Sequence, residues 1–199
     1  MKIAHSKLIG LLLLSFSLSA FAQRNELAGL VGGLVPLGDE FHVSNGTTIE
    51  GAFAHRLGKI PLLALYAEVP VTGGVNLSAS DPATALTTGY SSLYITPGLK
   101  IKIAPGLPIS PYLAAGAGYA RFHGTQSGQE ETDSKFAWDW GAGLDWKVFP
   151  HISIRGELRE FRSDSVDFFP CSSGVGCTAA VTPVPGHNLV GMVGLVLRF

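Results

Sequence analysis

The stretch FAWDWGAGLDWKV, residues 136–148, decides the fold, because two kinds of side chain alternate along it. One set is apolar or aromatic and comprises Phe136, Trp138, Trp140, Ala142, Leu144, Trp146 and Val148. The other set is small or charged and comprises Asp139, Gly141, Gly143, Asp145 and Lys147. A period of two is that of a β-strand, whose successive side chains point to opposite faces. The stretch therefore predicts a strand with one tryptophan-rich apolar face and one polar face.

The same alternation recurs along the chain and predicts eight strands. They are expected at about residues 26–35, 46–57, 62–73, 90–103, 111–122, 135–148, 151–163 and 187–199. Most of these segments span about 10 to 13 residues, whereas strands of soluble proteins usually span about 5 to 6. A tilted strand that crosses a membrane needs about 9 to 11 residues. The strand lengths therefore favour a membrane protein.

The predicted connections alternate between short and long. Short ones rich in turn-forming residues lie at 58–61, 104–110 and 149–150, and longer polar ones lie at 36–45, 74–89, 123–134 and 164–186. Transmembrane barrels have short periplasmic turns at one rim and long extracellular loops at the other. The chain is therefore predicted to be all-β, an eight-stranded antiparallel up-and-down transmembrane β-barrel. A soluble barrel of lipocalin type, with its apolar face inward, has the same alternation, but the sorted loops and the aromatic apolar face favour lipid outside.

The first 22 residues resemble a secretory signal peptide. Lys2 and Lys7 form a basic start, residues 8–16 form an apolar core, and Ala20-Phe21-Ala22 is a small-x-small cleavage pattern. We expect residues 1–22 to be removed and residues 23–199 to form the barrel. No later run of 18 apolar residues predicts a transmembrane helix. The formal net charge of −1 gives no reason to expect nucleic acid as a partner.

The end of the chain and three internal segments carry a family resemblance. The C-terminal GLVLRF resembles the signal by which outer-membrane proteins are recognised during assembly, with Gly194, Leu197 and Phe199 at the matching positions. The segments YITPGLK (94–100), PYLAAGAGY (111–119) and FAWDWGAGL (136–144) are similar to the small OmpA/OmpX-type outer membrane protein beta-barrel domain family. The resemblance implies location in the bacterial outer membrane, contact with outer-membrane lipid and recognition by the barrel assembly machinery.

The polar faces of the predicted strands gather charged residues of both signs. The inward-facing set is Glu50, Arg56, Glu68, Lys100, Lys102, Asp139, Asp145, Lys147, Arg155, Glu157 and Arg159. An eight-stranded barrel is just wide enough for side chains to fill it, so these groups are expected to pair across the interior as a polar core. A narrow ion path is the alternative, and it requires a continuous column of water.

Two cysteines, Cys171 and Cys177, lie in the longest predicted loop. An even pair in an oxidising compartment favours a disulfide, which would restrain this loop at the cell surface. A metal site is not expected, because no second pair of soft ligands lies nearby.

The sequence offers no catalytic residues and no sign of a cofactor. Barrels that deacylate lipid A carry a His and a Ser two positions apart near the last strand, whereas Leu189 stands two positions after His187 here. We expect His42 and His123 to lie in loops, and His55 and His151 to lie near turns. We expect a structural or adhesion-like protein, not an enzyme, whose loops contact extracellular or envelope components. The alternatives are a narrow porin-like channel and, third, an enzyme that modifies lipid A.

Overall fold

The computed structural model describes residues 24–37, 42–43, 46–80, 87–126, 129–164, 166–168, 182–184 and 186–199. The expected signal peptide and both cysteines, Cys171 and Cys177, lie outside these residues. Among the described segments, none is a helix long and apolar enough to cross a membrane.

The described residues form β-strands joined by short turns. The strands are β1 (Asn25–Pro36), β2 (His42–Val43), β3 (Gly46–Lys59), β4 (Leu63–Ser80), β5 (Thr87–Ile95), β6 (Gly98–Ile103), β7 (Ile109–Gln126), β8 (Gln129–Phe149), β9 (Ile152–Ser163), β10 (Val166–Phe168), β11 (Thr182–Val184) and β12 (His187–Arg198). All strand pairs are antiparallel.

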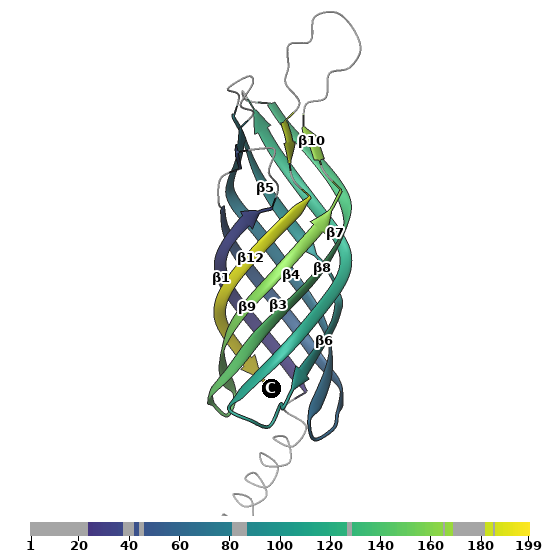
Figure 1. The fold of residues 1–199 in the computed structure, drawn as a ribbon, viewed down its shortest axis with the longest axis vertical. Coiled ribbons are helices and arrows are strands. Elements are labelled where there is room, and N and C mark those ends of the chain that lie inside the picture. The colour runs from purple at the N-terminus through teal and green to yellow at the C-terminus, as the bar shows by residue number, and fades with distance from the viewer. Residues whose placement is uncertain are drawn as a thin grey trace, which may run out of the picture.

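The sheet closes into a ring of eight strands. β1 pairs with β3 on one side and with β12 on the other, and the ring continues through β4, β5 with β6, β7, β8 and β9 back to β12. The strands run obliquely around a tall barrel, with the C-terminus at the end that carries the short turns (Figure 1). Closure leaves the main barrel without a free sheet edge, which satisfies the backbone polar groups that lipid cannot. The predicted all-β, eight-stranded barrel is confirmed.

The outer face of the ring is apolar. Exposed apolar side chains occur on every strand of the ring and include Leu27, Phe53, Val69, Leu99, Leu113, Trp140, Leu144, Leu158 and Leu195. The neighbouring positions in sequence point inward and are buried, so each strand separates its residues between the two faces. So large an apolar surface is unfavourable in water and favourable against lipid. The tryptophan-rich face of β8 is therefore the outer one.

One predicted strand is interrupted. The segment expected at 90–103 consists of β5 and β6, separated by Thr96 and Pro97. A proline lacks the N–H group that a sheet ladder uses, so the ladder breaks there. β5 and β6 both pair with β4 and β7, and together they occupy one position in the ring.

The predicted loops were wrong in three places. Residues 123–134 are not a loop but the upper part of a β7–β8 hairpin, which remains paired up to Gln126 and Gln129. β4 extends to Ser80 instead of ending near residue 73, and the long segment at 164–186 contains the paired strands β10 and β11. The top of the β7–β8 hairpin is polar on both faces, so no alternation marks it as a strand.

Candidate functional site

The half of the barrel interior nearest the short turns holds a buried network of ion pairs. Arg155 lies near its centre and contacts Asp145 at 2.8 Å, Glu26 at 3.3 Å and Glu68 at 3.5 Å. Lys100 joins Glu68 at 2.7 Å to Glu26 at 3.2 Å. All five side chains come from different strands, so the network ties together distant parts of the ring.

A second layer of charges lies further toward the long loops. Arg159 contacts Glu157 at 2.5 Å, Glu68 at 3.3 Å and Asp139 at 3.4 Å. Glu50 accepts a hydrogen bond from the Thr72 hydroxyl at 2.7 Å. Because Glu68 contacts cations of both layers, the two layers form one continuous polar core.

The eleven interior charges expected from the sequence divide into two groups. Nine are buried in the barrel: Glu50, Glu68, Lys100, Lys102, Asp139, Asp145, Arg155, Glu157 and Arg159. The other two, Arg56 and Lys147, are half-buried near the end with the short turns. Ion pairs connect every member of the buried group except Glu50.

Sequence reasoning missed two members of the network. Glu26 contacts Lys102 at 2.6 Å as well as Lys100 and Arg155, and Arg198 contacts both Glu26 and Asp145 at 3.3 Å. Both residues lie at strand ends: Glu26 is the second residue of β1, and Arg198 is the last residue of β12. The apolar neighbours Leu27 and Leu197 point outward, so the same alternation, carried to the strand ends, would have placed both charges inside.

Above the charges, toward the long loops, the interior is filled by aromatic and aliphatic side chains. The Tyr94 ring stacks on Phe161 with ring centroids 4.5 Å apart and meets Phe122 edge-on at 5.8 Å. Such aromatic pairs are favourable packing geometries. Asn188 donates a hydrogen bond of 2.8 Å to the Tyr94 hydroxyl, which fixes the ring. The remaining apolar members of this cluster include Leu30, Leu34, Leu77, Tyr90, Val190 and Met192.

The charged core and the aromatic and aliphatic cluster above it together close the described part of the interior. Solvent barely reaches the inward-facing side chains: Tyr94, Phe122 and Phe161 are at most 1% exposed, and Arg155 and Lys100 are 0% exposed. An open pore would leave the side chains that line it exposed to water. The interior of this barrel is therefore a packed core.

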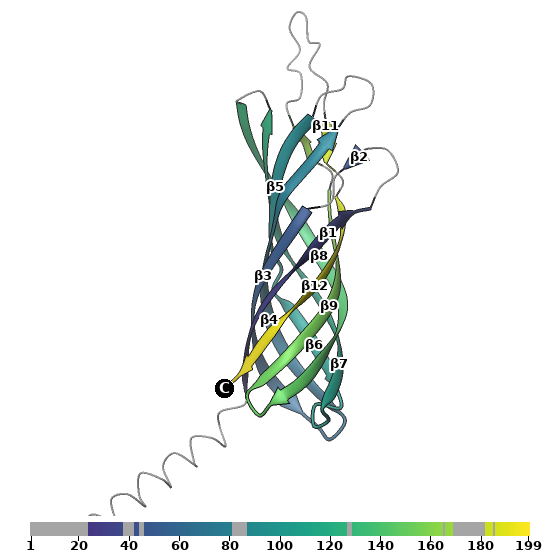
Figure 2. The same ribbon diagram turned by 90° about the vertical axis from the view of Figure 1, so that its left-hand side faces the viewer.

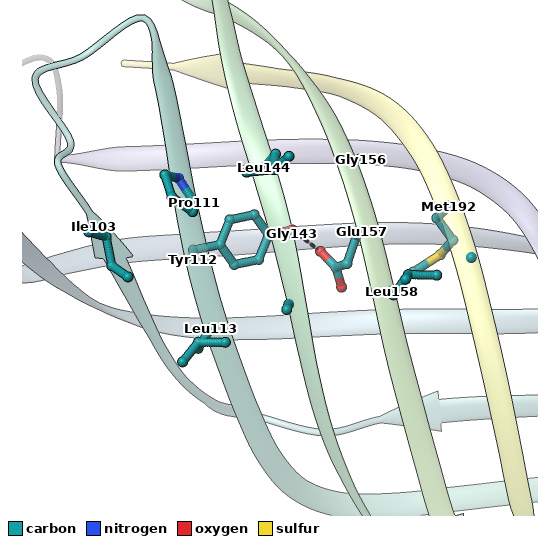
Figure 3. A pocket seen from close by; sticks show the side chains of 12 residues that line it. Ile103, Pro111, Tyr112, Leu113, Gly143, Leu144, Gly156, Glu157, Leu158 and Met192 are labelled. Atoms are coloured by element: carbon teal, nitrogen blue, oxygen red, sulfur yellow. Dashed lines mark hydrogen bonds between the residues drawn. The ribbon is translucent and has the colours of Figure 1, made fainter.

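A hollow on the outer face of the barrel is lined by lipid-facing side chains and by residues of the interior, among them Tyr112 and Glu157. It has a volume of about 660 Å³ and lies over β7, β8 and β9, with Leu113, Leu144 and Leu158 among its lining residues. In Figure 3 the Tyr112 ring lies against Gly143, and its hydroxyl donates a hydrogen bond to Glu157. A Cβ at Gly143 would lie 2.4 Å from the Tyr112 ring and 2.7 Å from the Gly156 carbonyl oxygen. Only glycine leaves room for this ring.

We predict that Gly143→Ala destabilises the barrel by about 1 to 3 kcal/mol, because the added methyl group must displace Tyr112 from Glu157. The matched control is Gly156→Ala on the adjacent strand, where a Cβ meets nothing within 4 Å and the effect should stay within about 0.5 kcal/mol. Urea unfolding of the two variants in detergent, followed by tryptophan fluorescence, measures the difference. Equal midpoints would show that Tyr112 adapts without cost.

The described residues contain no group of three or more His, Cys, Asp or Glu side chains arranged to hold a metal ion. Two histidines that the sequence assigned to loops lie on strands: His42 on β2 and His123 on β7. His123 Nδ1 hydrogen-bonds with Thr132 Oγ1 at 3.0 Å across the β7–β8 hairpin.

A wall of paired strands stands above the closed core. β4, β5, β7 and β8 rise beyond β1 and β12 at the end opposite the C-terminus (Figures 1 and 2). β2 pairs with the upper part of β4, from His42 opposite Ser80. β8 pairs with β7 as far as Gln129, but its pairing with β9 ends at Ala137. Among the described residues, positions 129–136 of β8 therefore have a paired strand on one side only.

The upper part of β8 is polar and acidic. Glu130, Glu131 and Asp133 lie on it, and Lys135 contacts Asp133 at 3.0 Å. The hydrogen bond from Lys135 holds the pKa of the Asp133 carboxyl below its usual range. This part of β8 thus carries negative charge at neutral pH.

Comparisons with known proteins agree with this architecture. A family model described as "Outer membrane protein beta-barrel domain" matches residues 8–178. No curated protein sequence matches the chain. Among solved structures, Neisserial surface protein A (NspA) is similar with a TM-score of 0.58 at 13% identity, over 88% of this chain and 96% of that one.

Two further structures share the fold. The outer membrane protein OprG from Pseudomonas aeruginosa has a TM-score of 0.57 at 13% identity, over 89% of this chain and 96% of that one. Ail, the attachment invasion locus protein of Yersinia pestis, has a TM-score of 0.52 at 13% identity, over 89% of this chain and 99% of that one. At these identities the likeness concerns the fold alone.

Proposed function

The chain belongs to the outer membrane protein beta-barrel domain family and is located in the bacterial outer membrane, and from this premise we propose that it is a surface-interaction protein. The barrel anchors the chain in the membrane, and the strand wall above it makes the contacts. The observation that carries the proposal is the edge of β8 at residues 129–136, which pairs with β7 alone among the described strands and stands above a closed interior.

An unpaired strand edge offers a row of backbone N–H and C=O groups. An extended segment of another protein can add to such an edge as a further strand, with main-chain hydrogen bonds providing affinity and side chains providing selectivity. The acidic side chains Glu130, Glu131 and Asp133 favour a partner segment with positive charge. They also oppose pairing between two copies of this edge, because like charges would face each other.

The closed core argues against transport as the main function. A narrow porin-like channel needs water along the axis, whereas Tyr94, Phe122 and Phe161 fill it. The names of two similar structures support a role at the cell surface. Ail is called an attachment invasion locus protein, and NspA is called a surface protein. For an enzymatic role we find no support: most buried titratable groups among the described residues are held in the ion-pair network of the core.

We predict that shortening the β7–β8 hairpin abolishes attachment without harming the barrel. Residues 123–132 are replaced by Asn-Gly, which joins Phe122 to its cross-strand partner Asp133 through a two-residue hairpin turn. Bacteria of a non-adherent strain that carry the parent or the variant are incubated with cultured epithelial cells and with immobilised fibronectin and laminin. The parent should confer attachment to at least one surface, and the variant should not.

A matched control separates the strand edge from its charge. Glu130→Gln with Glu131→Gln keeps the hairpin and removes two negative charges; it should weaken attachment and leave part of it. Gel migration of unboiled samples checks that all variants form barrels. Full attachment by correctly folded hairpin-shortened protein would contradict the proposal.

The proposal includes three further features of the chain. Residues 1–22 act as a cleaved signal peptide, Cys171 and Cys177 form a disulfide that restrains the loop after β10, and Gly194, Leu197 and Phe199 serve the barrel assembly machinery as a recognition signal. Mass spectrometry of the exported protein tests the first two together: a mature chain that begins at Gln23 and lacks alkylatable thiols is expected.

A further inference from the structure

The periplasmic end of the barrel carries an excess of positive charge. Arg56, Lys59, Lys147 and Arg198 lie at the ends of β3, β8 and β12 that meet the short turns, and the C-terminus lies at the same end (Figure 2). Lys147 interacts electrostatically with Lys59 and Arg198, and Tyr66 interacts with both Arg56 and Arg198, so the four cations surround one mouth of the interior.

Among the four cations at the periplasmic mouth, Arg198 forms ion pairs with carboxylates of the core. Glu26 and Asp145 each contact Arg198 at 3.3 Å, and the same two carboxylates also bind Lys102 and Arg155. Their charge is thus already shared among several cations. Within the described part of the chain, no carboxylate lies within ion-pair distance of Arg56, Lys59 or Lys147.

The direct contacts of Lys147 and Arg56 are with neutral groups, while Glu26 and Asp145 attract Lys147 only from beyond ion-pair distance. Lys147 donates a hydrogen bond of 2.6 Å to the Pro105 carbonyl oxygen, and Arg56 is hydrogen-bonded to Tyr66. The contacts therefore position the two cations, and their charge is at most partly compensated. A cationic mouth of this kind attracts anions and concentrates them locally.

The order of charges along the axis indicates which anion fits. Carboxylates and cations alternate from Glu68 to Lys100 and Arg155, then to Glu26 and Asp145, and then to the cations of the mouth. A further carboxylate layer below the mouth would continue this order. Arginine in particular matches the planar geometry of a carboxylate.

We propose that the periplasmic mouth binds carboxylate groups of a peptide in the periplasm. Arg56 and Lys147 are half-buried and, like Arg198, lie on the inward-facing side of their strands, so the ligand approaches along the barrel axis and not from the surrounding lipid. The opening of an eight-stranded barrel is narrow, and it suits a flexible acidic segment or the stem peptide of peptidoglycan better than a folded surface. The site is independent of the extracellular strand wall.

The test uses the folded barrel in phosphatidylcholine nanodiscs, where both ends are accessible and the lipid carries no net charge. A fluorescein-labelled hexaglutamate peptide is titrated by anisotropy at low salt. We expect saturable binding that weakens as salt is added, because exposed charges are screened. Arg56→Gln with Lys147→Gln should raise the dissociation constant about tenfold or more, since hydrogen bonds to charged groups are lost.

Two further variants keep the result interpretable. Lys59→Gln removes an exposed cation that forms no ion pair among the described residues, so it should fold normally and weaken binding several-fold. Arg121→Gln with Lys135→Gln removes the same number of charges at the extracellular end and should leave binding unchanged. An equal loss in this control would reduce the effect to net charge and overturn the proposal.

Competition identifies the source of the carboxylate. Displacement of the labelled peptide by a disaccharide tetrapeptide from peptidoglycan assigns the mouth to the cell wall, and displacement only by free acidic peptide assigns it to a protein segment; both outcomes support carboxylate binding. Displacement by inorganic phosphate at lower concentration than by either peptide would overturn it.

Discussion

Leu144→Arg is expected to prevent normal assembly of the barrel. Leu144 lies on the lipid-facing side of β8, with 53% of its surface exposed, between Ala142 and Trp146 on the same face. A charged side chain near the bilayer midplane of a barrel costs about 2 to 4 kcal/mol. The fraction of folded protein, measured by the migration of unboiled samples after refolding into vesicles, should fall accordingly.

Depth in the membrane provides the control for this variant. Val148→Arg places the same charge on the same face of β8 but near the periplasmic end, where the cost falls to about 0 to 1 kcal/mol. Equal assembly of Leu144→Arg, Val148→Arg and the parent would contradict the assignment of this face to lipid.

Arg155→Leu is expected to lower stability by about 3 to 5 kcal/mol, because it leaves buried carboxylates without their shared partner. Arg155 contacts Glu26, Glu68 and Asp145 and is inaccessible to solvent. Urea unfolding in detergent, followed by tryptophan fluorescence, measures the loss. An unchanged midpoint would mean that water screens these carboxylates and that the interior is wetter than a packed core.

A conservative and a remote substitution define this effect further. Arg155→Lys keeps the charge but cannot reach three carboxylates at once, so it should lie between the parent and Arg155→Leu. Arg121→Leu removes an exposed cation of β7 and should change stability by about 0.5 kcal/mol or less.

The sequence sufficed for the barrel because lipid imposes a strict alternation on every membrane-spanning strand. In β8 the residues from Phe136 to Val148 separate cleanly into an outer and an inner set, and the structure keeps that separation. The alternation also located the charged interior, since Asp139 and Asp145 stand opposite the tryptophans. Glu26 and Arg198 follow the same alternation at the strand ends, but they were overlooked because the inward positions beside them, Ala28 and Val196, are apolar.

Two other features could not be read from the sequence, for different physical reasons. The upper β7–β8 hairpin meets water on both faces, so its polar residues resemble a loop although its backbone is fully paired. The aromatic cluster of Tyr94, Phe122 and Phe161 comes from three separate strands. The alternation places each of these residues inside, but only the register of the closed ring brings the three rings together.

Ion conductance in planar lipid bilayers tests the central claim most directly. The claim is that side chains close this barrel, so that the protein functions through its surface and not as a channel. With a large porin as the positive control under the same conditions, insertion of the refolded parent protein should produce no stable current steps, because the aromatic cluster and the ion-pair network fill the axis. Reproducible single-channel steps from the parent protein would contradict the account and establish the barrel as a channel.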